Sequence, residues 1–237
     1  MDKFEYSLET YRESDAKIVA EILFHRYPIK SVIDIGCGLG SWLSTFQKQG
    51  CEVLGVDNHY ILSENKIYIA RDFLVGHDLS TTYVAAKKYD LALCLEVAEH
   101  IKPESADLLI DSLINCSDLI LFSAAIPFQG GQGHVNEQWP SYWIEKFAAK
   151  GYQPQDTIRP LIWTNENIQW WYRQNMILFE KRTGPSEADP GKYNLVHPEL
   201  YLANRKQLNS VTEGREGFRL AFSILFKTIG KRLGFRK

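Results

Sequence analysis

Three glycines at alternate positions, Gly36, Gly38 and Gly40, follow an apolar run whose one acidic member is Asp34. An apolar β-branched run that ends in glycines is typical of a buried parallel strand that turns sharply into a helix. Such a turn lets the backbone approach a nucleotide-like ligand closely. The sequence therefore predicts a ligand site at this turn, although an ordinary strand-to-helix turn would have the same residues.

The spacing of the glycines argues against a dinucleotide. A dinucleotide site needs glycine or alanine three residues after its second glycine, where helix amides face a pyrophosphate. That position is Ser41, and the third glycine comes early, at Gly40. The Asp-x-Gly-x-Gly-x-Gly pattern resembles motif I of the class I S-adenosylmethionine (SAM) methyltransferases. The resemblance implies that Asp34 faces the amino group of SAM.

Further motifs of the same family follow in order. A second apolar run, residues 51–57, ends in Asp57, about 20 residues past the glycines, where a carboxylate accepts ribose hydroxyls. Asp57 would also suit the cap of a helix. In the resemblance, Asp78 binds the adenine amino group and Leu79 supplies a backbone amide. The run YDLALCLEVAEHI, residues 89–101, is similar to the fourth strand and its exit in methyltransferases of small molecules, quinones and glycans.

Together these motifs predict one cofactor site, and the cofactor that the resemblance implies is SAM. For His100 we favour a structural role at the strand exit over catalysis, because residues 96–100 can hold this turn by hydrogen bonds. The expected cofactor-binding residues are Asp34, Gly36, Cys37, Gly38, Gly40, Asp57, Asn58, Asp78, Leu79, Leu95, Glu96 and His100.

A glycine-rich loop, within residues 123–143, carries the best-placed candidate base. Transfer of a sulfonium methyl group needs an in-line nucleophile, so the enzyme mainly orients the acceptor and removes a proton. His134 is expected to be that base, with Glu137 orienting it or binding a substrate hydroxyl. Alternatively, His134 closes the loop or caps a helix that begins near Ser141, and Glu137 is a solvated loop acid.

Aromatic residues gather in the same half of the chain, and their flat faces suit sugar rings or other planar acceptors. Core packing explains several of them equally. If residues 171–180 form a strand, alternation places Trp171, Arg173 and Asn175 on one face, which we expect to line the acceptor site together with Trp139. The expected acceptor is a small molecule or a sugar of a glycan. The alternative is a SAM-binding regulatory or scaffolding protein without catalysis.

The net charge and the spacing of the cysteines argue against a nucleic-acid-binding protein, a metal site and a disulfide scaffold. Residues 1–180 hold 24 acidic and 15 basic residues, a balance that repels nucleic acid. The four cysteines show neither a metal-binding spacing nor a disulfide pattern, so no metal is expected. The N-terminus lacks the features of a signal peptide and no apolar run reaches transmembrane length. The sequence therefore predicts a cytoplasmic protein.

Strands and helices alternate along residues 1–180, which predicts a doubly wound, Rossmann-like α/β domain. Two strand-like runs, residues 156–164 and 171–180, suit the C-terminal antiparallel hairpin of the seven-stranded class I methyltransferase sheet. A leading helix is expected at residues 13–26, and the expected strands lie near residues 31–35, 52–56, 67–69, 89–95 and 119–125.

The remaining residues, 181–237, form a linker and a basic tail with a net charge of +7. Residues 215–237 place apolar side chains on one helical face and basic side chains on another. This pattern predicts an amphipathic helix that contacts the inner surface of a membrane peripherally, or docks on a protein partner or on its own domain.

Overall fold

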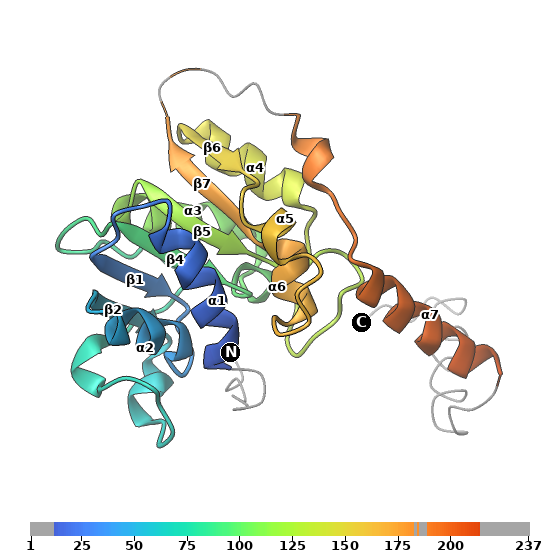
Figure 1. The fold of residues 1–237 in the computed structure, drawn as a ribbon, viewed down its shortest axis with the longest axis horizontal. Helices are drawn as coiled ribbons and strands as arrows, with labels where there is room; N and C mark the ends of the chain where they lie inside the picture. Colours follow the sequence, from blue (N-terminus) through green and yellow to red (C-terminus); the bar gives the residue numbers. More distant parts are fainter. Residues whose placement is uncertain (1–11, 183, 185–188, 214–237) are drawn as a thin grey trace. The chain divides into compact units, whose positions relative to one another are not determined.

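The computed structural model describes residues 12–182, 184 and 189–213 (Figure 1). Its centre is a seven-stranded sheet in the order β3-β2-β1-β4-β5-β7-β6. The strands are β1 (Ser31–Ile35), β2 (Glu52–Asp57), β3 (Leu74–Gly76), β4 (Leu91–Leu95), β5 (Leu119–Ser123), β6 (Tyr152–Gln155) and β7 (Ile177–Lys181). The first five strands pair in parallel, and β7 pairs antiparallel with both β5 and β6. The Rossmann-like fold class predicted from the sequence is confirmed.

Helices within residues 13–175 cover both faces of the sheet (Figure 1). The helices are α1 (Glu13–Phe24), α2 (Ser41–Lys48), α3 (Ala106–Cys116), α4 (Pro140–Ala149), α5 (Arg159–Ile162), α6 (Trp170–Asn175) and α7 (Pro198–Thr212). Single turns of 3-10 helix lie at η1 (His59–Ser63), η2 (Arg71–Phe73), η3 (Ala98–His100), η4 (Pro103–Ser105) and η5 (Pro190–Tyr193).

Alternation along the strands creates two apolar layers. Val32 faces a core with α1, α2, α5 and α6, whereas its neighbour Ile33 faces a second core with α3 and α4. In β4, Leu93 joins the first core and Cys94 the second. A strand that is apolar on both faces is buried on both, as parallel strands require.

Two local predictions were wrong. Residues 67–69 are not a strand, because Ile69 covers Gly40 and the amide of Tyr68 donates to the carbonyl of Leu39 at 2.8 Å. These apolar residues therefore pack over the glycine turn, and the third strand begins at Leu74.

The antiparallel pair at the end of the sheet is present, but its first member is β6, ahead of the predicted run 156–164, which instead contains α5. The second predicted run holds both α6 and β7. Helix α6 begins where the amide of Gln169 donates to the buried Asp15 carboxylate at 2.9 Å. This contact with α1 is a tertiary one, which local alternation does not reveal.

The chain divides into two compact units, one up to residue 195 and one from residue 196 onward. The first contains the whole sheet, and α7 is the helix of the second that the structure describes. The predicted amphipathic segment 215–237 lies outside the described residues. Within the described part of the chain, every helix is too short or too polar to traverse a bilayer.

Candidate active site

The glycine turn after β1 has the bare backbone that a close ligand requires. Gly36, Gly38 and Gly40 have φ angles of 89°, 51° and 81°, in the left-handed region that favours glycine. A Cβ atom on Gly36 would overlap the side chain of Val97 from the exit of β4. Cys37 is buried, and its thiol donates to the carbonyl of Gly38 at 3.6 Å.

Two acids at the carboxyl ends of β1 and β2 lie close to this turn. Asp57 accepts a hydrogen bond from the amide of Gly38 at 2.7 Å and one from the amide of Asn58 at 2.6 Å. Asp34 is 3% exposed, and its burial and the Asp57 carboxylate raise its pKa to about 8. The fold therefore places the two predicted acids together.

Asp78 and Leu79 follow β3 at the same edge of the sheet. Asp78 is exposed and accepts hydrogen bonds from the amide and the hydroxyl of Ser80, at 3.0 and 2.7 Å. These bonds lower the pKa of Asp78. Leu79 is half-buried and packs against the second core.

Strand β4 leaves the sheet through a strained turn. After the buried Leu95, Glu96 has a φ of 55°, a conformation that side chains other than glycine rarely adopt. The amide of Glu96 donates to the carbonyl and the hydroxyl of Ser123, at 3.0 and 3.1 Å. Backbone strain held in place by such bonds is common at functional sites.

The Glu96 carboxylate lies at the centre of a carboxamide network. It accepts a hydrogen bond from Nε2 of Gln129 at 3.0 Å and one from Nδ2 of Asn175 at 3.1 Å. Gln174 joins the network by donating to Oδ1 of Asn175 at 2.9 Å. Burial nevertheless raises the pKa of Glu96.

The next turn, η3, carries Glu99 and His100. Glu99 is 1% exposed, and burial and the charge of Glu96 raise its pKa well above its ordinary value. Burial and the His134 ring lower the pKa of His100 to about 4. The carbonyl of Glu99 accepts hydrogen bonds from the amides of Val135 and Asn136, at 2.9 and 3.0 Å, which tie the following loop to this turn.

Because the amides of Val135 and Asn136 are bound to the carbonyl of Glu99, the preceding residue, His134, lies beside His100. Its ring lies 4.9 Å from that of His100, centroid to centroid, in an edge-on arrangement. Nδ1 of His134 lies 2.9 Å from Oε1 of Glu137, and the backbone of Gly131 passes so close that a Cβ there would overlap the His134 ring. His134 and Glu137 therefore lie within hydrogen-bonding distance of each other.

Glu137 also fixes the loop backbone. Its carboxylate accepts hydrogen bonds from the amides of Phe128 and Gly130, at 2.9 and 2.7 Å. At the first turn of α4, Oδ1 of Asn194 accepts the amide of Ser141 at 3.0 Å, so Asn194 has the capping role considered for His134.

The predicted substrate residues do not share one face. Because residues 170–175 form a helix, Arg173 and Asn175 point in different directions: Arg173 donates to the carbonyl of Trp163 at 3.2 Å, whereas Asn175 reaches Glu96. Trp171 packs against the first core and Trp139 is half-buried before α4. The prediction that Trp171, Arg173 and Asn175 line one strand face was wrong.

Gln129, Gln174 and Glu99 reach the site without having been predicted for it. Gln129 and Gln174 have no motif of their own, and only the fold brings Gln129 to Glu96 and Gln174 to Gln129. Glu99 had a signal, because it stands directly before His100 at the exit of a predicted strand.

The glycine turn and its acids fit SAM. Three positive φ angles leave the backbone without side chains, and carboxylates stand at the ends of two adjacent parallel strands. Each oxygen of Asp57 that accepts a backbone amide retains a second lone pair for a hydroxyl. Asp34 lies where a cationic ligand group would favour its ionised form.

Residues 8–175 match the family described as methyltransferase domain. The ubiquinone biosynthesis O-methyltransferase of Stutzerimonas stutzeri is 31% identical over 90 residues, which cover 34% of this chain and 37% of that protein. The enzyme of the same name from Hydrogenovibrio crunogenus is 26% identical over 133 residues, 51% of this chain and 49% of that protein. The chain thus spans between about a third and a half of the length of these relatives.

Solved structures share the fold. CalS10 from Micromonospora echinaspora superposes with a TM-score of 0.52 at 12% identity, covering 77% of this chain and all of CalS10. SAM-bound magnesium protoporphyrin IX methyltransferase from Synechocystis PCC 6803 gives 0.51 at 17% identity, over 76% and 86% of the two chains. SAM is the methyl donor of this fold family, as the sequence predicted. The chain belongs to the class I SAM-dependent methyltransferases.

Proposed function

We propose that the protein transfers a methyl group from SAM to a hydroxyl of a small-molecule acceptor. When bound, SAM supplies an electrophilic methyl group, and its transfer breaks a carbon–sulfur bond, forms a carbon–oxygen bond and releases the hydroxyl proton. The observation that carries the proposal is the His134–Glu137 pair, held at the edge of the sheet where the glycine turn and Asp57 also lie.

The pair has the arrangement of a base and its orienting acid. Since a carboxylate only accepts hydrogen bonds, Nδ1 of His134 carries the hydrogen that it shares with Glu137. Nε2 then has a lone pair that can accept a proton from an acceptor hydroxyl. Glu137 keeps the ring in this tautomer and is itself fixed by two backbone amides.

For the cofactor we propose the contacts that the family resemblance implies. Asp57 binds the ribose hydroxyls and Asp34 faces the amino group. Asp78 and Leu79 bind the adenine. The carboxyl ends of β1, β2 and β3 meet at one edge, where ligands of open α/β sheets bind.

We propose a saccharide hydroxyl as the acceptor. The carboxamides of Gln129 and Asn175 donate to Glu96, and that of Gln174 donates to Asn175, which gathers hydrogen-bonding groups that suit a polyhydroxylated molecule. Half-buried Trp139 offers an aromatic face to a sugar ring. The curated relatives are named for ubiquinone biosynthesis, so phenolic acceptors form the second class to test.

We also propose a peripheral location at the inner membrane surface, through residues 215–237. Their apolar and basic side chains occupy separate faces of the expected helix. Residues 181–237, to which they belong, carry a net charge of +7. Anionic lipid attracts such segments.

The full-length protein is to be tested for SAM binding by calorimetry and for turnover by release of S-adenosylhomocysteine. Sugar nucleotides and catechols serve as the two acceptor panels, and mass spectrometry detects the methylated product. Asp57→Ala is expected to abolish SAM binding, because it removes both carboxylate oxygens beside Gly38.

His134→Gln is expected to lower kcat by about 10²- to 10⁴-fold while SAM affinity stays unchanged. His25→Gln is the matched control, since His25 is exposed at the end of α1. SAM binding without turnover on either panel would instead favour a regulatory or scaffolding protein. Full turnover by His134→Gln would refute the assignment of the base.

A further inference from the structure

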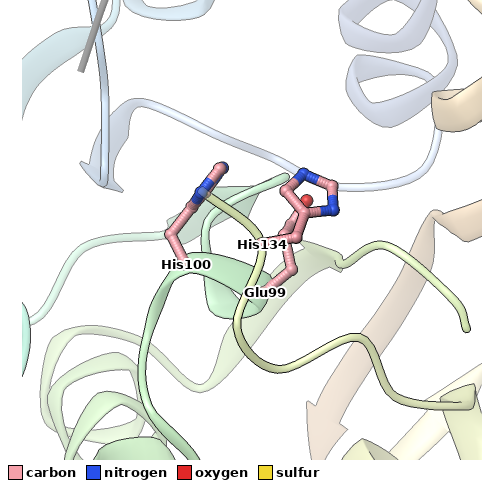
Figure 2. A group of neighbouring side chains, drawn as sticks. All are labelled: Glu99, His100 and His134. Carbon is pink, nitrogen blue, oxygen red and sulfur yellow. The ribbon is translucent and has the colours of Figure 1, made fainter. Parts of the chain in front are cut away.

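One cluster at this edge has donor atoms that the proposed methyl transfer does not account for. Glu99, His100 and His134 each bring one oxygen or nitrogen atom to within 4.8 Å of those of the other two. Figure 2 shows Glu99 and His100 rising from the turn after β4, while His134 comes from the loop after β5. Two segments far apart in the sequence thus converge on one point.

The Glu99 carboxyl group is the least satisfied member of this cluster. It is 1% exposed, and neither of its oxygens has a hydrogen-bond partner of normal geometry. The Glu96 carboxyl group is a second acid beside it. A buried carboxylate beside a second acid is costly, and a bound cation would compensate both acids.

The two histidines are oriented as metal-binding histidines usually are. Nδ1 of His134 donates to Glu137, and the ring of His100 donates to the carbonyl of Gly133. A histidine that ligates a metal typically donates its other ring N–H to a carboxylate or a backbone carbonyl. Each ring is therefore held in place by the protein, as in such sites.

We propose that Glu99, His100 and His134 bind one divalent transition-metal ion. Two imidazoles and one carboxylate favour a transition metal such as zinc or cobalt over magnesium, which prefers oxygen ligands. Bond lengths of about 2.0–2.2 Å place ligand atoms about 3 to 3.5 Å apart, so side-chain movements of about 1 Å close the site. A tetrahedral ion with three protein ligands has its fourth coordination position open, as in catalytic zinc sites.

The open position gives the ion a role that rests on the proposed methyl transfer. An acceptor hydroxyl bound there would have its O–H bond weakened, and its proton would leave to solvent. The oxygen is then the nucleophile. With the ion bound, His134 would be a ligand, and the ion would supply the activation for which the free imidazole would otherwise serve.

The test begins with metal binding alone, using Co²⁺ as a spectroscopic probe of the full-length protein. One equivalent is expected to bind, with visible absorption bands typical of nitrogen and oxygen ligation, and Zn²⁺ is expected to displace it. Mg²⁺ is expected not to compete. A wild-type protein that binds Co²⁺ no more tightly than its Glu99→Gln/His100→Gln/His134→Gln variant would overturn the proposal.

Single variants locate the site. Glu99→Gln, His100→Gln and His134→Gln are each expected to remove the Co²⁺ spectrum, and Glu137→Gln to weaken binding by about 10- to 100-fold. His25→Gln controls for adventitious surface histidine. If a variant does not fold, as judged by circular dichroism, the rise in wild-type Tm on Zn²⁺ addition still tests binding. No such rise in the wild type would contradict the site.

Activity then separates this proposal from the proposed function. Methyl transfer that persists in full after chelation, and in His100→Gln, refutes the metal site while the O-methyltransferase assignment stands. A protein that binds Co²⁺ at these residues but methylates no hydroxyl acceptor refutes the proposed function and leaves the metal site intact.

Discussion

The fold changes the pKa of the Asp34 carboxyl group. Because burial and Asp57 raise its pKa to about 8, the folded protein retains a proton that the unfolded chain releases near pH 4. Stability linked to this group is therefore present at low pH and is lost as pH rises from about 4 to about 8.

We expect Asp34→Asn to be more stable than the wild type at pH 8, by several kcal/mol, since one pKa unit corresponds to about 1.4 kcal/mol. The two proteins are expected to converge near pH 4. Urea unfolding from pH 4 to 9 measures the difference, and a difference that does not change with pH would contradict the assigned shift.

At the residue scale the sequence was most informative where backbone geometry restricts the choice of residue. Gly36, Gly38 and Gly40 must adopt positive φ angles, so their spacing is visible in the sequence. Side chains with no such restriction were missed, because Gln129 and Gln174 acquire their positions only from packing. The approach of His134 to His100, 4.9 Å between ring centroids, likewise depends on the fold, because the two residues stand on different loops.

At the element scale, the glycine turn depends on both conformation and space. Gly36→Ala would combine a strained φ of 89° with an overlap against Val97. Gly50→Ala is a matched control, since Gly50 has a φ of 86° but no atoms within 4 Å of a Cβ.

We expect Gly50→Ala to lower the free energy of unfolding by about 1 to 2 kcal/mol from strain alone. Gly36→Ala is expected to cost more and also to weaken SAM binding, because the turn must shift. Thermal unfolding and calorimetry measure both effects. Equal losses of stability, with equal SAM affinity, would show that the contact with Val97 is unimportant.

Arg159 connects α5 to other segments of the chain through hydrogen bonds. It is 1% exposed, pairs with Asp156 at 2.6 Å and donates to the carbonyls of Gln174 and Tyr193, at 3.2 and 2.9 Å. Removing this side chain leaves buried acceptors without a donor.

We expect Arg159→Met to lower the free energy of unfolding by about 3 to 5 kcal/mol. The half-exposed Arg182, which pairs with Glu180, provides the comparison: Arg182→Met is expected to cost less than about 1 kcal/mol. Chemical denaturation of both variants measures their free energies of unfolding. Similar small decreases in the two variants would mean that Arg159 contributes little to stability.

The predicted strand boundaries failed where tertiary contacts override local pattern. In residues 170–175 alternation suggested a strand, yet the Asp15 carboxylate binds the amide of Gln169 and the chain turns into α6. Residues 67–69 have strand-forming side chains that instead cover Gly40. Strands β1, β2, β4 and β5 were predictable because both of their faces are apolar.

At the scale of the whole molecule, the charge is divided between two parts. Residues 1–180 carry a net charge of −9, and residues 181–237 one of +7. Lys227→Gln, Lys231→Gln and Arg232→Gln together, in the full chain, are expected to reduce binding to anionic vesicles by at least tenfold, at about 1 kcal/mol per basic residue. Co-sedimentation at low and high salt measures the effect.

Neutral vesicles serve as the control for that comparison. Equal sedimentation of the wild type and the triple variant with anionic vesicles would remove the argument for a peripheral membrane location. If the variant retains wild-type methyl transfer, the three substitutions affect membrane binding and not catalysis.

The sheet order has a consequence for where the domain can be cut. The family match ends at residue 175, yet β7, residues 177–181, lies between β5 and β6 and donates backbone hydrogen bonds to both. A fragment that stopped at the family boundary would leave β5 with an open edge and β6 without a neighbour. Exposed strand edges pair with one another, so such a fragment would aggregate although it kept every residue of the glycine turn.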